Sequence, residues 1–155
     1  MINFVVEGPA VPQARPRFTK FGHAYDTQKC RDYKKLVGLR AKEAMLGREP
    51  LSDAVIVMID IRISPPESWS NVRRMAAIHS GWVTAKKGDI DNCCKSVTDA
   101  IIGICYEDDA QVVGLIATKR YAEESETIVE IIEPSHNHAP IWAAGSLRRA
   151  FHFLE

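Results

Sequence analysis

The stretch from Ala54 to Ile63 constrains the fold most. Its residues alternate along the chain and are rich in Val and Ile, a pattern typical of a long strand in the core of a sheet. Pro65 and Pro66 follow and end this strand. Three other stretches are predicted as strands, at residues 1–6, 111–121 and 125–132. We expect the last two to form a hairpin through the polar turn at residues 122–124.

Helical signals separate these strands. A first helix is predicted to begin after Asp26 and Thr27 and to end at about Leu46, before Gly47. A short second helix, capped within residues 68–70, is predicted to run to about Ile78. The third is predicted from apolar residues spaced by three and four, and it ends near Gly103. These apolar residues are Ile90, Cys93, Cys94, Val97, Ile101 and Ile104.

Length and pattern together predict the architecture. A chain of 155 residues, 46% of them hydrophobic, is long enough for one domain with a core and too short to expect two. We therefore predict an α+β fold, a two-layer sandwich in which a mixed sheet of about four strands has helices on one face. Trp69 and Met75 are expected to pack against this domain. The basic residues of the first helix are expected in solvent, namely Lys29, Lys34, Lys35, Lys42 and Arg48.

The composition excludes several classes of protein. No apolar run is long enough to cross a membrane, and no signal-peptide pattern is visible, so we expect a soluble, cytoplasmic protein. The four cysteines have no zinc-knuckle spacing and do not form a disulfide framework. Adjacent Cys93 and Cys94 are predicted to be small apolar fillers on the buried side of their helix.

An acidic stretch is the strongest candidate for chemistry. If the chain is extended there, the side chains of Asp89 and Asp91 leave the same side of the backbone and can share one divalent cation, which prefers oxygen ligands. Lys95 lies one helical turn beyond Asp91. Alternatively, Asp91 is a helix cap and Lys95 a surface partner. An EF-hand calcium loop is excluded, because a loop counted from Asp89 lacks the central glycine of that motif.

Asp109 is a further candidate, with Asp108 beside it. The helix rises roughly 17 Å between Asp91 and Ile102, and the seven residues from there to Asp109 span at most about 23 Å. The loop must therefore double back for Asp109 to meet Asp89 within one subunit. Otherwise Asp109 would serve a neighbouring subunit. On spacing alone, Asp108 and Asp109 could equally be a solvated turn before a strand.

The basic residues are unevenly distributed, although the net charge is zero. Residues 15–42 contain nine Lys or Arg against two Asp, so this part carries +7 and the remainder −7. Within it, residues 13–25 form a predicted loop of basic and aromatic residues, a mixture suited to contact with a nucleic-acid backbone. Beside Asp89, the side chains of Lys86 and Lys87 could hold a phosphate or screen the carboxylates.

These motifs carry a family resemblance. The run Lys87-Gly88-Asp89-Ile90-Asp91-Asn92-x-x-Lys95, followed by Asp99-Ala100 and by residues 107–112 (Glu-Asp-Asp-Ala-Gln-Val), resembles the signature of RusA-type Holliday junction resolvases. Two positions depart from it. Gly88 stands where the family often has proline, and Cys93-Cys94 stand where it usually has larger apolar residues. The resemblance covers residues 1–134, and residues 135–155 are expected to form a short packing or dimer-contact helix.

The resemblance implies a homodimeric endonuclease that nicks opposed strands of a four-way DNA junction during recombination and repair. Its cofactor would be Mg²⁺, with Mn²⁺ as a substitute. The implied metal ligands are Asp89, Asp91 and Asp109, which are also catalytic, and Lys95 is the implied essential lysine. The family commonly has a basic segment near the N-terminus. The expected DNA-binding residues are Arg15, Arg17, Lys20, Lys86 and Lys87.

Two other functions remain open from the sequence. One is a Mg²⁺-dependent nuclease acting on other branched DNA, such as flaps or forks, and the other is a DNA-binding module without catalysis. The family resemblance also makes a bacterial or phage-infected cell, with a phage or prophage origin, the expected setting.

Overall fold

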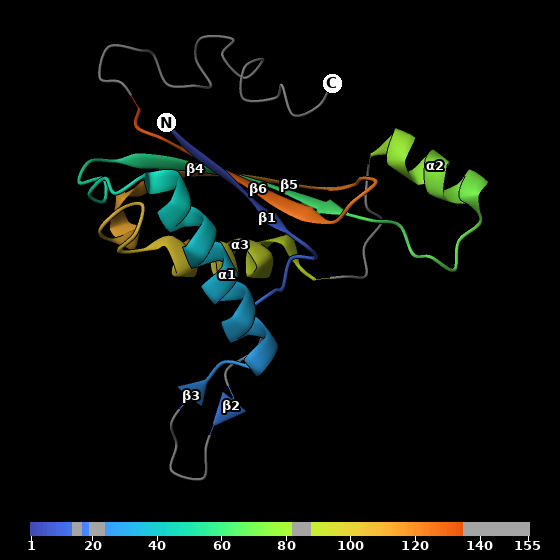
Figure 1. Cartoon of the computed structure of the whole chain (residues 1–155), viewed down its shortest axis with the longest axis horizontal. Coiled ribbons are helices and arrows are strands. Elements are labelled where there is room, and N and C mark those ends of the chain that lie inside the picture. The colour runs from blue at the N-terminus through green and yellow to red at the C-terminus, as the bar shows by residue number, and fades with distance from the viewer. Residues whose placement is uncertain (14–16, 19–23, 82–87, 135–155) are drawn as a thin grey trace.

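The fold is built on a four-stranded sheet in the order β1-β6-β4-β5 (Figure 1). The structure is a computed structural model that describes residues 1–13, 17–18, 24–81 and 88–134. Strand β6 pairs antiparallel with both β1 and β4, whereas β4 and β5 are parallel, so the sheet is mixed as predicted. The strands are β1 (Ile2–Glu7), β4 (Val55–Ile63), β5 (Val112–Tyr121) and β6 (Glu126–Ile132).

The predicted hairpin between the last two strands is wrong. Strand β4 lies between β5 and β6 and pairs with both. The short connection from β5 to β6 passes the end of β4, where the Ala122 amide donates to the Ile63 carbonyl (3.1 Å) and Ser125 bonds to Ser64. Seven of the nine residues of β4 are buried, from Val55 to Ile61. A strand buried over this length has a neighbouring strand on each edge, so β4 lies between β5 and β6. A hairpin would pair β5 directly with β6 and leave no room for β4 between them.

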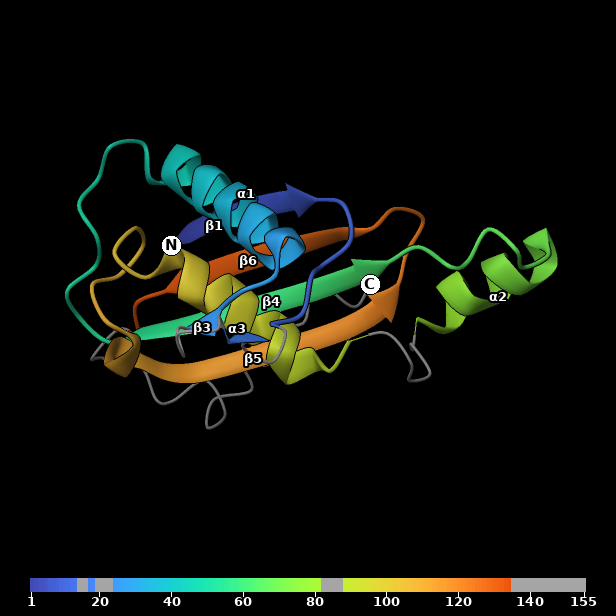
Figure 2. The ribbon, with the colours of Figure 1, turned by 90° about the horizontal axis from the view of Figure 1, so that it is seen from below.

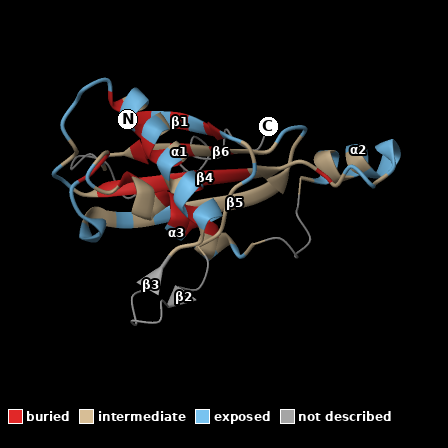
Figure 3. Cartoon of the chain, turned by 60° about the horizontal axis from the view of Figure 1, so that its bottom comes forward, coloured by how far each residue is buried: buried red, intermediate tan, exposed pale blue. Residues whose placement is uncertain are grey.

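Two helices cover one face of the sheet. Figure 2 shows α1 (Gln28–Met45) and α3 (Ile90–Ile101) on the same side, with α3 nearer β5. The helices can approach closely because α1 has Gly38 at the crossing, where a Cβ atom would lie 3.4 Å from the Ala100 carbonyl oxygen. The buried core lies between the two layers (Figure 3). This confirms the predicted α+β two-layer arrangement with helices on one face.

The core is lined by the apolar positions that the helix and strand patterns marked. Alternate residues of β1 and β6 point into it, such as Val6 and Val129. Tyr33 of α1 is also buried, and its hydroxyl bonds to that of Thr127 on β6 (2.9 Å), although burial raises the pKa of Tyr33 to about 12. All four cysteines are buried free thiols, which confirms that Cys93 and Cys94 are apolar fillers.

Helix α2 (Asn71–Ser80) projects from the end of the sheet and has no buried residue (Figures 1 and 3). Trp69, just before it, packs against Tyr121 with ring centroids 5.8 Å apart, and Arg73 lies over the indole ring. The prediction for Trp69 is therefore confirmed. Met75 is 61% exposed, so the prediction that it packs is wrong. A helix attached at one end offers Met75 no apolar surface.

Part of the predicted basic loop forms a small hairpin. Strands β2 (Arg17–Phe18) and β3 (Ala24–Tyr25) pair antiparallel, and Figure 1 shows them projecting beyond the N-terminal end of α1. The expectation of an irregular loop is wrong for these four residues. Residues 135–155, with their predicted helix, lie outside the described residues. Among the helices that are described, none is long and apolar enough to span a membrane.

Candidate active site

The N-terminal end of α3 carries two of the predicted acidic residues. Asp89 is the N-cap and Asp91 lies in the first turn, where the helix dipole favours negative charge. The Asp89 carboxylate makes no capping hydrogen bond, and both carboxylates are exposed. They line an open pocket of ≈ 590 Å³ together with Ala117, Thr118 and Lys119 of β5. Two unshielded carboxylates therefore face one pocket.

Gly88 sets the path of the chain into this pocket. Its φ of +69° lies in the left-handed region that favours glycine, and a Cβ atom here would lie 3.3 Å from both Cys93 Sγ and Pro12 Cγ. Proline, which the family often has here, fixes φ near −65° and is incompatible with this path. Glycine in place of the family's proline therefore allows the left-handed backbone conformation that directly precedes Asp89.

The sequence pattern leaves open whether Lys119 points into the site or into solvent, and the structure places it at the pocket. Its Nζ donates a hydrogen bond to the Gly88 carbonyl (2.8 Å), and its side chain lines the same pocket as Asp89 and Asp91. The next residue, Arg120, points to the opposite face of the sheet and pairs with buried Asp60 (3.0 Å). Lys119 pairs with Ile61 of β4, whose side chain lies in the core under the helices, and paired residues of neighbouring strands point to the same face. Lys119 therefore lies on the helix-covered face of the sheet.

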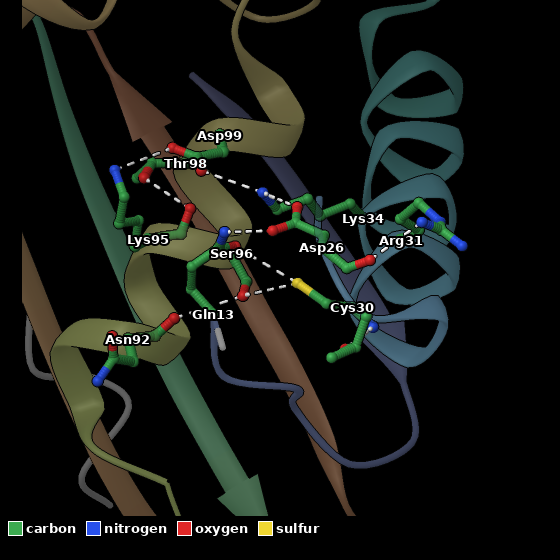
Figure 4. A network of polar contacts seen from close by, with 11 residues as sticks. Gln13, Asp26, Cys30, Arg31, Lys34, Asn92, Lys95, Ser96, Thr98 and Asp99 are labelled. Atoms are coloured by element: carbon green, nitrogen blue, oxygen red, sulfur yellow. Dashed lines mark hydrogen bonds and ion pairs between the residues drawn. The ribbon is translucent and has the colours of Figure 1, made fainter. Parts of the chain in front are cut away.

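Lys95 lies one turn beyond Asp91 and is largely exposed. Its Nζ is 3.5 Å from Asp99 Oδ1, and the side chain is 63% exposed. The other oxygen of Asp99 accepts a hydrogen bond from Lys34 of α1 (3.1 Å), which also bonds to Asp26 (3.1 Å), as Figure 4 shows. Asp99 therefore joins Lys95 to the first helix.

The prediction that Lys34 is solvated is wrong, because its side chain is only 19% exposed between two carboxylates. Partial burial opposes the charge of Lys34, but the hydrogen bonds with Asp26 and Asp99 outweigh it and raise the pKa of Lys34. Lys29, Lys35, Lys42 and Arg48 are exposed as predicted.

The basic hairpin of β2 and β3 is anchored at its base, through Gln13 before it and Asp26 after it. The backbone N–H of Gln13 donates to the backbone carbonyl of Asn92 in the first turn of α3 (2.8 Å). The side-chain amide of Gln13 donates to the Asp26 carboxylate (2.8 Å) (Figure 4). Gln13 precedes the hairpin and Asp26 follows it. The predicted DNA-binding residues Arg15, Lys20, Lys86 and Lys87 lie outside the described residues, and Arg17 is placed in β2 by its backbone alone.

Asp109 lies at the other end of α3. It begins a 3-10 turn, η1 (Asp109–Gln111), which Asp108 caps by accepting from the Ala110 amide (2.8 Å). From the residue after this turn, β5 runs about 23 Å before it reaches Lys119. Within the described ranges of the chain, no group of three Asp, Glu, His or Cys could hold a metal. One subunit thus brings together Asp89 and Asp91, but not Asp109.

The thiols beside the pocket are not suited to ligate a metal. Burial raises the pKa of Cys93, with Lys119 opposing this and the two nearby aspartates adding to it. Burial likewise raises the pKa of Cys94 to about 11. Both thiols are buried and neither lines the pocket, so the carboxylate oxygens of Asp89 and Asp91 are its exposed donor groups.

Comparison with known proteins identifies the family. The model of the family described as endodeoxyribonuclease RusA matches residues 7–132, which include both ends of α3 and the acidic residues at each. The chain belongs to the RusA family. The predicted recognition is confirmed, and the protein is an endodeoxyribonuclease, a hydrolase that acts on DNA. RusA-family resolvases act on branched DNA and depend on a divalent metal ion.

A relative with a similar sequence is also found. The Bacillus subtilis (strain 168) protein described as uncharacterized protein YqaN is 34% identical over 141 residues, which cover 86% of this chain and 97% of YqaN. Its description assigns no substrate, so the family model carries the enzymatic assignment.

Proposed function

We propose that this RusA-family protein is a Mg²⁺-dependent homodimeric endonuclease that resolves four-way DNA junctions by paired nicks. The observation that carries the proposal is the pocket at the start of α3, where Asp89 and Asp91 expose two carboxylates within the family match. We assign the nuclease domain to residues 1–134. A phage or prophage origin accords with the family but is not needed for the mechanism.

The donor set fits a hard divalent cation. Both groups are exposed carboxylates, the neighbouring Cys93 and Cys94 thiols are buried and do not line the pocket, and Asp89 makes no capping bond in this arrangement. Asp89 and Asp91 would hold the ion, with Asp109 of the partner subunit as the third ligand. The chemistry that bound Mg²⁺ supplies is polarisation of the scissile phosphate and a lower pKa of the attacking water.

The chain's own residues would orient and neutralise the phosphate. Lys95 lies one turn beyond Asp91, and its exposed ammonium would offset the negative charge that builds on the phosphate oxygens in the transition state. Asp99 restricts where that ammonium can lie. The basic hairpin, anchored through Gln13 to the first turn of α3, would bring Arg15, Arg17 and Lys20 to the DNA backbone beside the pocket. Lys86 and Lys87 would add contacts just before Asp89.

A dimer would complete the site. Asp109 lies at the far end of α3 from Asp89, so an interface that delivers it to a neighbour must include the surface around η1 and the start of β5. At the start of β5, which is an edge strand, Val113 is 62% and Leu115 is 50% exposed, so this part of the surface offers two apolar side chains to a partner. A two-fold dimer would also present two sites to the two opposed strands of a junction.

The deciding experiment is incubation of the purified protein with a synthetic four-way junction, with Mg²⁺ or with a chelator. We expect symmetrically paired nicks that require the metal, and faster cleavage of the junction than of a fork, a flap or a linear duplex. The matched D89N variant should bind the junction without cutting it. Preferred cleavage of forks or flaps would replace the junction assignment, and metal-independent binding without any cleavage would point to a non-catalytic module.

A further inference from the structure

We infer that Lys119 is a positioning residue of the active site, which holds the backbone before Asp89 and so fixes that carboxylate in the pocket. The inference rests on the proposed function, since it concerns the same acidic pocket. Lys119 lies on β5, whereas Asp89 begins α3, so this contact joins the sheet to the helix at the point where the carboxylates lie.

The first support is the hydrogen bond from Lys119 Nζ to the Gly88 carbonyl, at 2.8 Å. Gly88 has a left-handed φ of +69° and directly precedes Asp89. Glycine has more backbone freedom than any other residue, so the segment needs an external contact to hold one conformation. Lys119 supplies that contact from a strand paired along its length with central β4.

The second support is the position of the side chain in the pocket. Lys119 is half-buried and lines the pocket with Asp89 and Asp91. An ammonium group has three N–H donors, and the Gly88 carbonyl takes one. The positive charge also reduces the repulsion between two neighbouring carboxylates.

A surface lysine kept for solubility would behave differently. Lys42 on α1 is such a residue, exposed and remote from the pocket. By contrast, the ammonium of Lys119 is directed to a backbone carbonyl next to a predicted metal ligand. Removing the Lys119 ammonium should therefore change the arrangement of Asp89, while removing that of Lys42 should not.

The test compares K119M, which keeps the length of the side chain without its donor, with K119R, which keeps donor and charge. K42M is the matched control for the loss of one positive charge. Mn²⁺ binding is measured on each protein without DNA, by electron paramagnetic resonance of the free ion, and junction cleavage is measured at saturating and subsaturating DNA. Thermal unfolding without metal checks the fold of each variant.

We expect K119M to bind Mn²⁺ at least several-fold more weakly and to have a kcat lowered by about 10- to 100-fold, with a KM for the junction within about twofold of wild type. K119R should recover most of both properties, and K42M should match wild type. Wild-type Mn²⁺ affinity and kcat in K119M would overturn the inference. Equal impairment of K119R and K119M, with a lowered unfolding temperature in both, would also overturn it, because packing would then explain the effect.

These outcomes are distinguishable from a failure of the proposed function. If the wild-type protein cuts no branched DNA, the proposed function fails, whereas the Mn²⁺ measurement still tests Lys119. If the wild type cuts junctions and K119M cuts them equally well with unchanged Mn²⁺ affinity, only the role of Lys119 fails.

Discussion

If Asp109 is shared between subunits, as proposed, two inactive variants should restore each other's activity. D89N loses a carboxylate at the N-terminal end of α3, and D109N loses one beyond its C-terminal end. The helix alone rises about 17 Å from Ile90 to Ile101, between these positions. A mixed dimer has one site that combines Asp89 of the D109N subunit with Asp109 of the D89N subunit, while its other site lacks both groups.

The expected activity follows from counting sites. Random assortment of the two variants at equal concentration makes about half of the dimers mixed, and one site in each is intact, so about a quarter of the wild-type number of sites should be active. Paired nicks should be lost, because no dimer has two intact sites. If Asp109 instead acted within its own subunit, every site in the mixture would lack one ligand and no nicks should form.

The assay is the initial rate of nicking of an end-labelled four-way junction by proteins refolded together from denaturant. A mixture of wild type with the double variant D89N/D109N is the matched control, since its mixed dimers have no intact site if Asp109 is shared. That mixture should retain about a quarter of the wild-type rate, against about a half if each subunit forms its own site. An inactive mixture of the single variants, together with half activity in the control, would refute the reasoning.

Three further predictions concern single residues. G88A should lower stability by about 1–2 kcal/mol, because Gly88 has φ +69°, and should slow cleavage, as measured by urea unfolding and nicking rates. D99N should cost about 1–2 kcal/mol of stability, since it removes the carboxylate charge that the partly buried Lys34 and the exposed Lys95 share, and it should lower kcat several-fold with unchanged junction affinity. D60N should cost about 3–5 kcal/mol, because it leaves Arg62 and Arg120 without their buried carboxylate; a loss below 1 kcal/mol would contradict this. Burial alone would raise the pKa of Asp60, but hydrogen bonds from Arg120, Thr118 and Arg62 outweigh burial and lower it. The stability that ionised Asp60 provides should therefore be lost from the wild type as the pH falls below about 4. D60N should show no such loss.

The elements of this fold were predictable where their signals are local. The alternation of residues 54–63 predicted β4, and the apolar spacing after Asp89 predicted α3, because each pattern records which side of one element is buried. The order of the strands is not local. A four-residue connection usually joins paired strands, yet β5 and β6 are separated by β4, whose burial requires a neighbour on both edges.

The chemistry of the site was also only partly predictable. The sequence identified Asp89, Asp91 and Lys95 from spacing and resemblance, and the helix places all three on its exposed side. It could not show that Lys34 lies between Asp26 and Asp99, because Lys34 and Asp99 are 65 residues apart in the chain and meet only when α1 packs on α3. It left open whether Asp109 joins the others within one subunit, which depends on the path of the loop after α3.

The bulge in β5 explains why the strand pattern alone could not decide which way Lys119 points. Val112 and Ala117 both pack against the core, although they are five positions apart in a strand whose side chains alternate. The register shifts at this point, since Val55 pairs with Val112 and Ile56 with Gly114, which leaves Val113 as an extra residue in β5. Counted from Val112 without this bulge, Lys119 would lie on the opposite face of the sheet. The bulge reverses the alternation and turns Lys119 toward the acidic pocket, which is a recognised use of bulges beside active sites.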